Sequence, residues 1–177
     1  MDSGEGILNE NINWSAIYRI AQAAGLGPVV EAQHLLDDGR KPGDLLIRFF
    51  GDAGANAAYD ITGINALRAD LLERAAADPK QVVQIAHQKK ERSVGAHLRA
   101  EGISFRPMAF TSLGLWHQVA VTELSKLVKS KCLRLGLDEK KTMDQEMKIL
   151  SVVIQKGNAA MLVGRQIFPA NEDNNVF

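Results

Sequence analysis

Two short apolar segments separated by a turn constrain the fold of this chain more than any other feature. Asp44–Phe50 and Ala57–Thr62 are rich in residues that favour strands, and the small residues of Gly51–Ala55 between them are typical of a turn. The two segments therefore predict a β-hairpin. A further strand is predicted over Ile103–Phe110, where Pro107 favours the end of a strand or the edge of a sheet.

Helical periodicity is found on both sides of these strands. The predicted helices span residues 13–24, 28–36, 69–77, 81–101, 115–135 and 142–154, and the last is expected to resume over 158–163 after a break at Gly157. Strands interleaved with helices are typical of an α/β or α+β arrangement. We expect an α/β fold in which a small mixed β-sheet, the hairpin plus a further strand, is flanked by helices, with extra helices at the C-terminal end.

Length and composition are those of one globular domain. The chain has 177 residues, of which 46% are hydrophobic, and its lone cysteine, Cys132, excludes a disulfide framework within the chain. We expect a flexible N-terminus over 1–10, the α/β domain over 11–136, a helical extension over 137–168 packed on that domain, and a flexible tail over 169–177. Without an apolar run of about eighteen residues or a secretory signal, no membrane association is expected, and the expected location is the nucleus or cytoplasm.

Charge is distributed unevenly, although 21 basic residues balance 21 acidic ones. Residues 1–79 carry six basic and 12 acidic side chains, a balance of −6, whereas residues 80–134 carry 10 basic and three acidic ones, a balance of +7. A net charge of zero therefore does not exclude a nucleic-acid partner, because the middle segment is a candidate phosphate-binding surface.

Three carboxylates are associated with the predicted hairpin. Asp44 stands at the start of one strand, Asp60 follows on the partner strand after 15 intervening residues, and Glu31 lies upstream on a predicted short helix. Carboxylates on adjacent strands can hold Mg²⁺ or Mn²⁺ together with a substrate phosphate, and such a metal promotes phosphodiester cleavage. The alternatives are a strand-edge or turn role for Asp44, and a salt bridge or loop-capping role for Asp60, which is costly inside an apolar strand unless it is bound.

Two adjacent lysines lie on the long helix predicted after Pro79. Lys90 shares a helical face with Val83 and Val94, and Lys89 lies on the next face, so either lysine borders the apolar side and could reach over the sheet towards the carboxylates. There it could orient an attacking water or neutralise the scissile phosphate. A solvated basic face is the alternative.

The basic segment also contains candidate DNA contacts. Lys89, Lys90 and Arg92 form one group, and Lys126 and Lys129 belong to a second group on the later helix. Lysine and arginine side chains that neutralise phosphates bind DNA in a salt-dependent and largely sequence-independent way. The alternative for the second group is the solvent side of an amphipathic helix.

The order of these motifs resembles a known family. The motifs are Lys41-Pro42-Gly43-Asp44, Asp60-Ile61-Thr62, the helix with Lys89-Lys90, and the strand from Gly102 to Pro107 that leads to Gly114. Together they resemble the restriction-like endonuclease domain of site-specific non-LTR retrotransposons, a member of the PD-(D/E)XK nuclease superfamily. The resemblance covers roughly residues 27–116, about half of the chain.

This resemblance implies DNA strand cleavage with Mg²⁺ or Mn²⁺ bound at Asp44 and Asp60. It further implies that Lys90, or else Lys89, is the catalytic lysine, and that Glu31 assists from its helix. Two positions depart from the superfamily's pattern: Gly43 stands between Pro42 and Asp44, and Thr62 occupies the usual lysine position after the second acid. DNA is the implied partner, with the chain acting alone, as a homodimer or as part of a reverse-transcriptase-containing protein.

Two other classes of function remain open. A catalytically inactive DNA-binding or protein-interaction domain would keep the nuclease fold without its chemistry, as Gly43 and Thr62 permit. A helical scaffold protein would use the helices from Leu115 onward for oligomerisation. DNA cleavage that is lost on substitution of Asp60 separates the enzyme from both.

Overall fold

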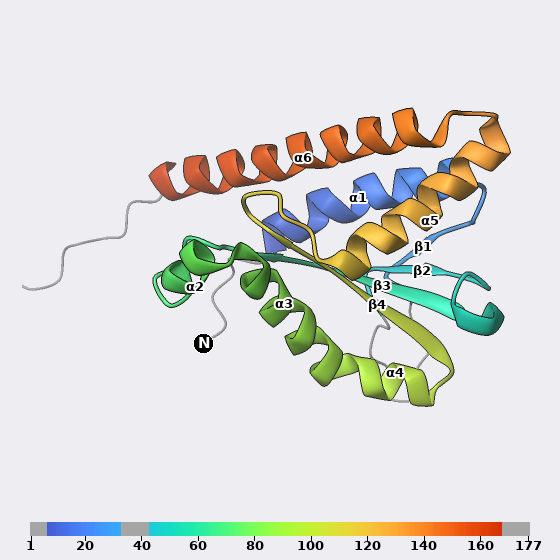
Figure 1. Cartoon of the computed structure of the whole chain (residues 1–177), viewed down its shortest axis with the longest axis horizontal. Coiled ribbons are helices and arrows are strands. Elements are labelled where there is room, and N and C mark those ends of the chain that lie inside the picture. The colour runs from blue at the N-terminus through green and yellow to red at the C-terminus, as the bar shows by residue number, and fades with distance from the viewer. Residues whose placement is uncertain (1–6, 33–42, 168–177) are drawn as a thin grey trace, which may run out of the picture.

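The computed structural model describes residues 7–32 and 43–167 and contains a four-stranded mixed sheet with helices on both faces (Figure 1). The strands are β1 (Val29–Val30), β2 (Leu45–Ile47), β3 (Asn56–Ile64) and β4 (Ile103–Thr111). The helices are α1 (Ile7–Ala23), α2 (Leu72–Ala77), α3 (Pro79–Lys90), α4 (Ala96–Ala100), α5 (Gln118–Leu135) and α6 (Glu139–Ile167). The predicted α/β class, a small mixed sheet flanked by helices, is confirmed.

The sheet has the order β1-β2-β3-β4. β1, β2 and β3 pair antiparallel, so β2 and β3 form the predicted hairpin, whereas β3 and β4 are parallel and are connected through α2, α3 and α4. β4 is an edge strand, as Pro107 indicated, because a residue without an N–H group cannot complete a ladder on both sides.

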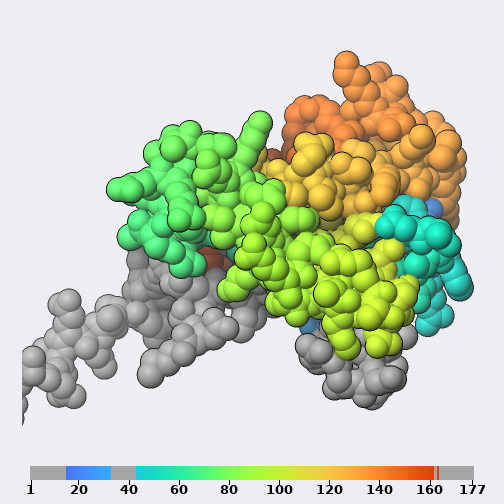
Figure 2. Space-filling view, turned by 60° about the horizontal axis from the view of Figure 1, so that its bottom comes forward, coloured from blue at the N-terminus to red at the C-terminus, as the bar shows by residue number. Residues whose placement is uncertain are grey.

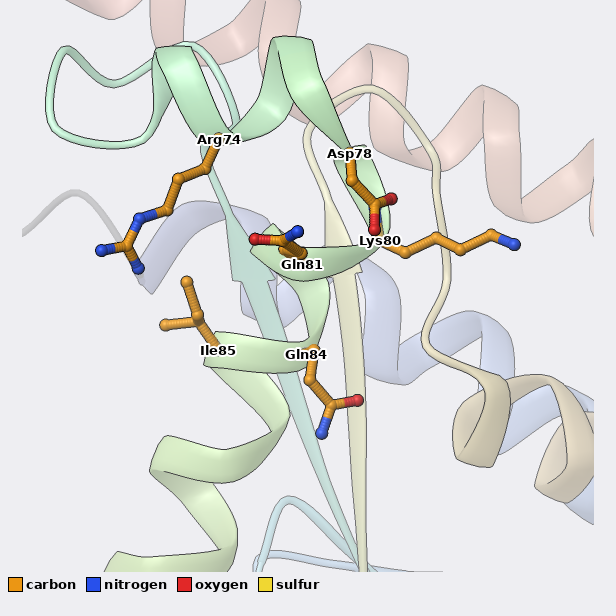
Figure 3. Close-up of a pocket in the computed structure, with 6 residues that line it drawn as sticks. All are labelled: Arg74, Asp78, Lys80, Gln81, Gln84 and Ile85. Carbon is orange, nitrogen blue, oxygen red and sulfur yellow. The ribbon is translucent and has the colours of Figure 1, made fainter.

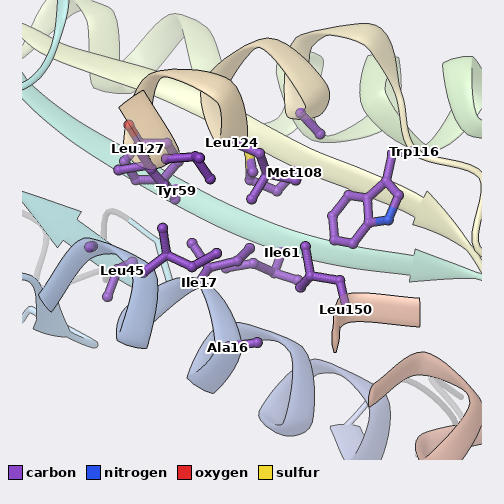
Figure 4. Close-up of a cluster of buried hydrophobic side chains, with 14 of the residues drawn as sticks. Ala16, Ile17, Leu45, Tyr59, Ile61, Met108, Trp116, Leu124, Leu127 and Leu150 are labelled. Carbon is purple, nitrogen blue, oxygen red and sulfur yellow. The ribbon is translucent and has the colours of Figure 1, made fainter. Parts of the chain in front are cut away.

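One face of the sheet packs against α1 and α5, with α6 outside them (Figure 1). Alternate residues of the strands point to this side because side chains alternate along a strand. The core contains Leu45, Tyr59, Ile61 and Met108 from the sheet and Leu124 from α5, all almost completely buried (Figure 4). Full burial of each large aliphatic side chain contributes roughly 1.5–3 kcal/mol, so this layer is the main source of stability.

The opposite face packs against α3 and α4. Leu46, Ala58 and Phe105 contact Leu98 of α4 in one cluster, and further along β4 Ala109 packs against α3 in a second. Because side chains alternate along a strand, Asp60 points to the same face of the sheet as Ala58. A carboxylate of β3 therefore lies under the helices that connect β3 to β4.

Three predicted helices differ from the observed ones. Residues 28–32 are not helical, because the β-branched Val29 and Val30 pair with β2 instead; residues 33–36 of that predicted helix lie outside the described part of the chain. The helix predicted over 81–101 is divided by a π-helical turn at Glu91–Gly95. α1 begins at Ile7, earlier than the predicted start at Asn13.

The predicted break at Gly157 is also wrong, since α6 continues through it. Gly157 is buried in the helix, and the side-chain amide of the next residue, Asn158, donates a hydrogen bond of 2.7 Å to the Ser112 carbonyl oxygen in the loop after β4. Packing of this kind offsets the roughly 1 kcal/mol that glycine costs in a helix. Among the described helices, none is both long and apolar enough to cross a membrane.

Candidate active site

Asp60 and Lys90 form an ion pair between the sheet and the helix above it. Asp60 lies in the middle of β3 and Lys90 is the last residue of α3, and the Lys90 Nζ atom is 2.9 Å from Asp60 Oδ2 and 3.3 Å from Oδ1. The side chains retain 16% and 31% of their exposed surface, so the pair is partly covered but accessible to small groups. The Thr62 hydroxyl donates a further hydrogen bond to Asp60 Oδ2.

Asp44 is the residue just before β2, next to the last paired residue, Leu45, which lies opposite Tyr59. Its carboxylate reaches β3 beside Asp60, because the hydrogen-bond donor that it meets is the main chain of the next residue, Ile61. Asp44 Oδ2 accepts a 2.6 Å hydrogen bond from the Ile61 N–H group, which fixes this carboxylate against β3.

Gly43 brings the start of β2 close to β3. A Cβ atom at this position would lie 2.7 Å from the Tyr59 carbonyl oxygen, which is shorter than real Cβ contacts. A glycine is therefore required for the close approach that precedes Asp44. Lys41 and Pro42 of the same motif lie outside the described residues.

Glu31 is not on a helix, contrary to the prediction. It follows β1 in a turn with φ 45°, its side chain is exposed, and its N–H group donates to the Asp44 carbonyl oxygen at 3.0 Å. Pairing of β1 with β2 brought its main chain to Asp44, which helical periodicity could not anticipate. Its role as a catalytic helper stays a prediction.

Asp44 and Asp60 are the two carboxylates of the predicted magnesium or manganese site, and this metal site stays a prediction. Within the described part of the chain, no group of three or more histidine, cysteine, aspartate or glutamate side chains could hold a metal by itself. Mg²⁺ is commonly bound by one or two carboxylates, with waters and substrate phosphate as the other ligands. Asp44 and Asp60 are the residues that would hold it.

The two candidate lysines point in different directions. Lys90 faces the sheet and contacts Asp60, whereas Lys89 is exposed and lines a hollow together with Arg92. Sequence periodicity left the choice between Lys89 and Lys90 open because both border the apolar side of the helix. Packing of Val83 and Ala86 on Ala109 fixes the rotation of α3 and so directs Lys90 inward.

The second predicted basic group lies on α5, against the opposite face of the sheet. Lys126 Nζ is 2.7 Å from Glu123 Oε1, and Lys129 is exposed. The structure therefore does not bring Lys126 and Lys129 together with Lys90. Their contact with DNA stays a prediction.

A charge cluster around Glu123 is a feature that the sequence did not reveal. The Glu123 carboxylate accepts a hydrogen bond from the Tyr59 hydroxyl at 3.2 Å and is 3.3 Å from Arg106 Nε. Arg106 also pairs with Asp52 at 2.6 Å. Burial, together with the negative charge of Glu123, raises the pKa of Tyr59 far above its usual range, and Arg106 lowers the pKa of Asp52. No local signal could have found it, because Tyr59 and Glu123 are 64 positions apart.

His87 and His117 form a second unpredicted contact, one turn before Lys90. Their rings stack with centroids 3.9 Å apart, and His117 Nε2 lies 2.7 Å from Gln84 Oε1. Burial and the neighbouring His87 lower the pKa of His117.

No protein-family model matches this chain, and no curated protein has a sequence that matches it significantly.

Proposed function

We propose that this protein is a metal-dependent DNA endonuclease of the restriction-like type, resembling the PD-(D/E)XK domain of retroelement proteins, either alone or within a reverse-transcriptase-containing protein. The observation that carries the proposal is the contact of Lys90 with Asp60, next to the Ile61 N–H group that holds the Asp44 carboxylate. A lysine on a helix thereby supplies the positive charge that Thr62 does not supply. The motif order of the sequence is in agreement with this assignment.

Each residue has a distinct role in the proposed reaction. Asp44 and Asp60 would bind Mg²⁺ or Mn²⁺, which when bound supplies a Lewis acid and a water of lowered pKa. The Lys90 ammonium, held beside Asp60, stabilises the negative charge that develops on the scissile phosphate. The Ile61 N–H group and the Thr62 hydroxyl each hold one oxygen of the two carboxylates in place.

A catalytically inactive DNA-binding domain is the second candidate. The observation that favours it is that Lys90 lies within 3.3 Å of both oxygens of Asp60 and so neutralises this carboxylate without a metal. In that case the pair stabilises the packing of α3 on the sheet. DNA would then be bound but not cleaved.

Cleavage of supercoiled plasmid DNA in Mg²⁺ or Mn²⁺ distinguishes the two candidates. We expect the wild-type protein to nick or linearise the plasmid, and we expect Asp60→Asn and Lys90→Met to lose this activity. Lys140→Met is the matched control, because it removes an exposed lysine of α6, away from the candidate site. This control should retain the wild-type rate.

Two results would overturn the endonuclease proposal. One is a wild-type protein that binds DNA but leaves it intact with either metal. The other is equal cleavage by the Asp60→Asn variant purified in the same way, which would identify a contaminating nuclease.

A further inference from the structure

The outward side of α3 carries positive charge without any acidic residue of its own. Exposed positions on this helix are occupied by lysine and glutamine, and Pro79–Lys90 contains no aspartate or glutamate. We propose that this side of the molecule binds the phosphate backbone of duplex DNA. We call it the outer α3 surface and define it by Arg74, Lys80, Gln81, Gln88, Lys89 and Arg92.

The basic residues of this surface have no acidic partner in the described part of the chain. Arg74, Lys80, Lys89 and Arg92 make no side-chain ion pair or hydrogen bond with any residue in the described ranges. In contrast, Arg99 pairs with Glu91, and Lys131 pairs with Glu146. Exposed cations without partners are the groups that can replace counterions along DNA.

One acid, Asp78, also lines the first hollow, where its Oδ1 atom accepts a 3.0 Å hydrogen bond from the Lys80 N–H group and caps α3. Its charge offsets one of the four cations of the surface, which leaves three positive charges in excess. Gln81 and Gln88, whose amides have no partner among the described residues, can donate to phosphate oxygens, as such side chains commonly do in DNA complexes.

Two adjacent hollows follow this surface. The first hollow is lined by Arg74, Asp78, Lys80, Gln81, Gln84 and Ile85, and the Arg74 and Lys80 side chains point to opposite sides of it (Figure 3). The second hollow is lined by Ile85, Gln88, Lys89, Arg92 and Ser93. From Gln81 to Arg92 the helix extends about 16 Å, which corresponds to about five base pairs of duplex. Figure 2 shows the continuous band of α2, α3 and α4 across this face of the molecule.

The outer α3 surface and the candidate active site are separate groups of residues. Lys89 and Arg92 are exposed on the outside of this part of the chain, whereas Lys90, whose ammonium contacts Asp60, faces the sheet. The choice of DNA as the ligand rests on the proposed function, whereas the surface itself rests on charge and exposure.

Binding is best measured in the Asp60→Asn background, where cleavage cannot interfere. A fluorescein-labelled 30-base-pair duplex is titrated by anisotropy at several salt concentrations. The test variant carries Arg74→Gln, Lys80→Gln, Lys89→Gln and Arg92→Gln. The matched control carries Arg19→Gln, Lys140→Gln, Lys141→Gln and Lys156→Gln, which remove the same charge from exposed positions of α1 and α6.

We expect the test variant to lose at least tenfold in affinity near 0.1 M salt. Each phosphate contact contributes about 0.9 to the slope of log K against log salt, so this slope should fall by about 3–4. The control should stay within about threefold of the parent, because it has the same net charge as the test variant but keeps the outer α3 surface. Melting curves verify that both variants are folded, and the pairs Arg74/Lys80 and Lys89/Arg92, substituted separately, should each give about half of the change.

The outcomes separate this inference from the endonuclease proposal. Unchanged binding by the test variant, or an equal loss in the control, would overturn the outer α3 surface even if the wild type cleaves DNA. Conversely, a selective binding loss in a protein that cannot cleave DNA would support the surface and contradict the nuclease.

Discussion

Glu123 of α5 and Asp60 of β3 lie on opposite sides of the sheet and differ in how many polar and charged partners each carboxylate has. Glu123 retains 5% of its exposed surface and has the Tyr59 hydroxyl and the Arg106 and Lys126 cations as partners. Asp60 retains 16% and has one ammonium, that of Lys90, with the Thr62 hydroxyl. Glu123 therefore belongs to a buried cluster that holds α5 on the sheet. The Asp60 carboxylate remains accessible, as a site for an added ligand requires.

Removing Glu123 should produce the largest loss of stability. Glu123→Ala leaves Arg106 without its buried partner, and breaking such a pair costs about 3–5 kcal/mol of unfolding free energy. Urea unfolding followed by circular dichroism measures this loss. The control is Asp144→Ala, which removes an exposed partner of Lys148 and should cost less than about 1 kcal/mol. Equal losses in both variants would contradict the structural role of Glu123.

Replacing Asp60 should have the opposite effect, a large loss of activity with little loss of stability. We expect Asp60→Asn to lower plasmid cleavage by about 10²–10³-fold, because it removes the proposed metal ligand and the partner of Lys90. Stability should change by no more than about 1 kcal/mol, since the pair is partly solvated. Kinetics with Mn²⁺ and urea unfolding of the same preparation provide both values. A large loss of stability with full residual activity would assign Asp60 to packing instead.

Substitution of Gly43 tests the candidate site without altering Asp44 or Asp60. An added methyl group would lie 2.7 Å from the Tyr59 carbonyl oxygen, so Gly43→Ala must displace the start of β2. We expect a loss of about 1–3 kcal/mol, as for other overpacked positions, together with weaker Mn²⁺ binding by electron paramagnetic resonance. Mn²⁺ binding at wild-type strength would show that Asp44 does not depend on this close approach.

A change of pH is expected to have the smallest effect on the stability of the protein. The pKa of His117 is lowered by burial and by His87, so the unfolded chain binds a proton more readily than the folded protein does. Stability should therefore fall as the pH decreases through about 6.5, the usual histidine pKa, and be restored above it. His117→Asn, which keeps an acceptor for the α5 N-cap, should abolish most of this dependence.

Unfolding in urea at pH 7.5 and 5.5 measures this effect, and nuclear magnetic resonance titration of the His117 ring identifies its source. Glu123→Ala should retain the same dependence, because the Glu123 cluster contains no histidine. If His117→Asn retains the full pH dependence, another group is responsible.

The strands were predictable because their signals are local. Alternating and β-branched residues identified β2, β3 and β4, and Pro107 indicated an edge. β1 was not predicted, because a strand of two residues depends on its partner for stability. Its pairing with β2, rather than helical propensity, determined where Glu31 lies.

Local patterns in this chain specify the class of fold, the hairpin that carries Asp44 and Asp60, and the lysines on the following helix. They do not specify that Lys90 rather than Lys89 contacts Asp60, or that Lys126 lies across the sheet beside Glu123, because both depend on packing between distant segments. Periodicity specifies which residues share a face of one element. The rotation of a helix over a sheet depends on how side chains distant in sequence pack together.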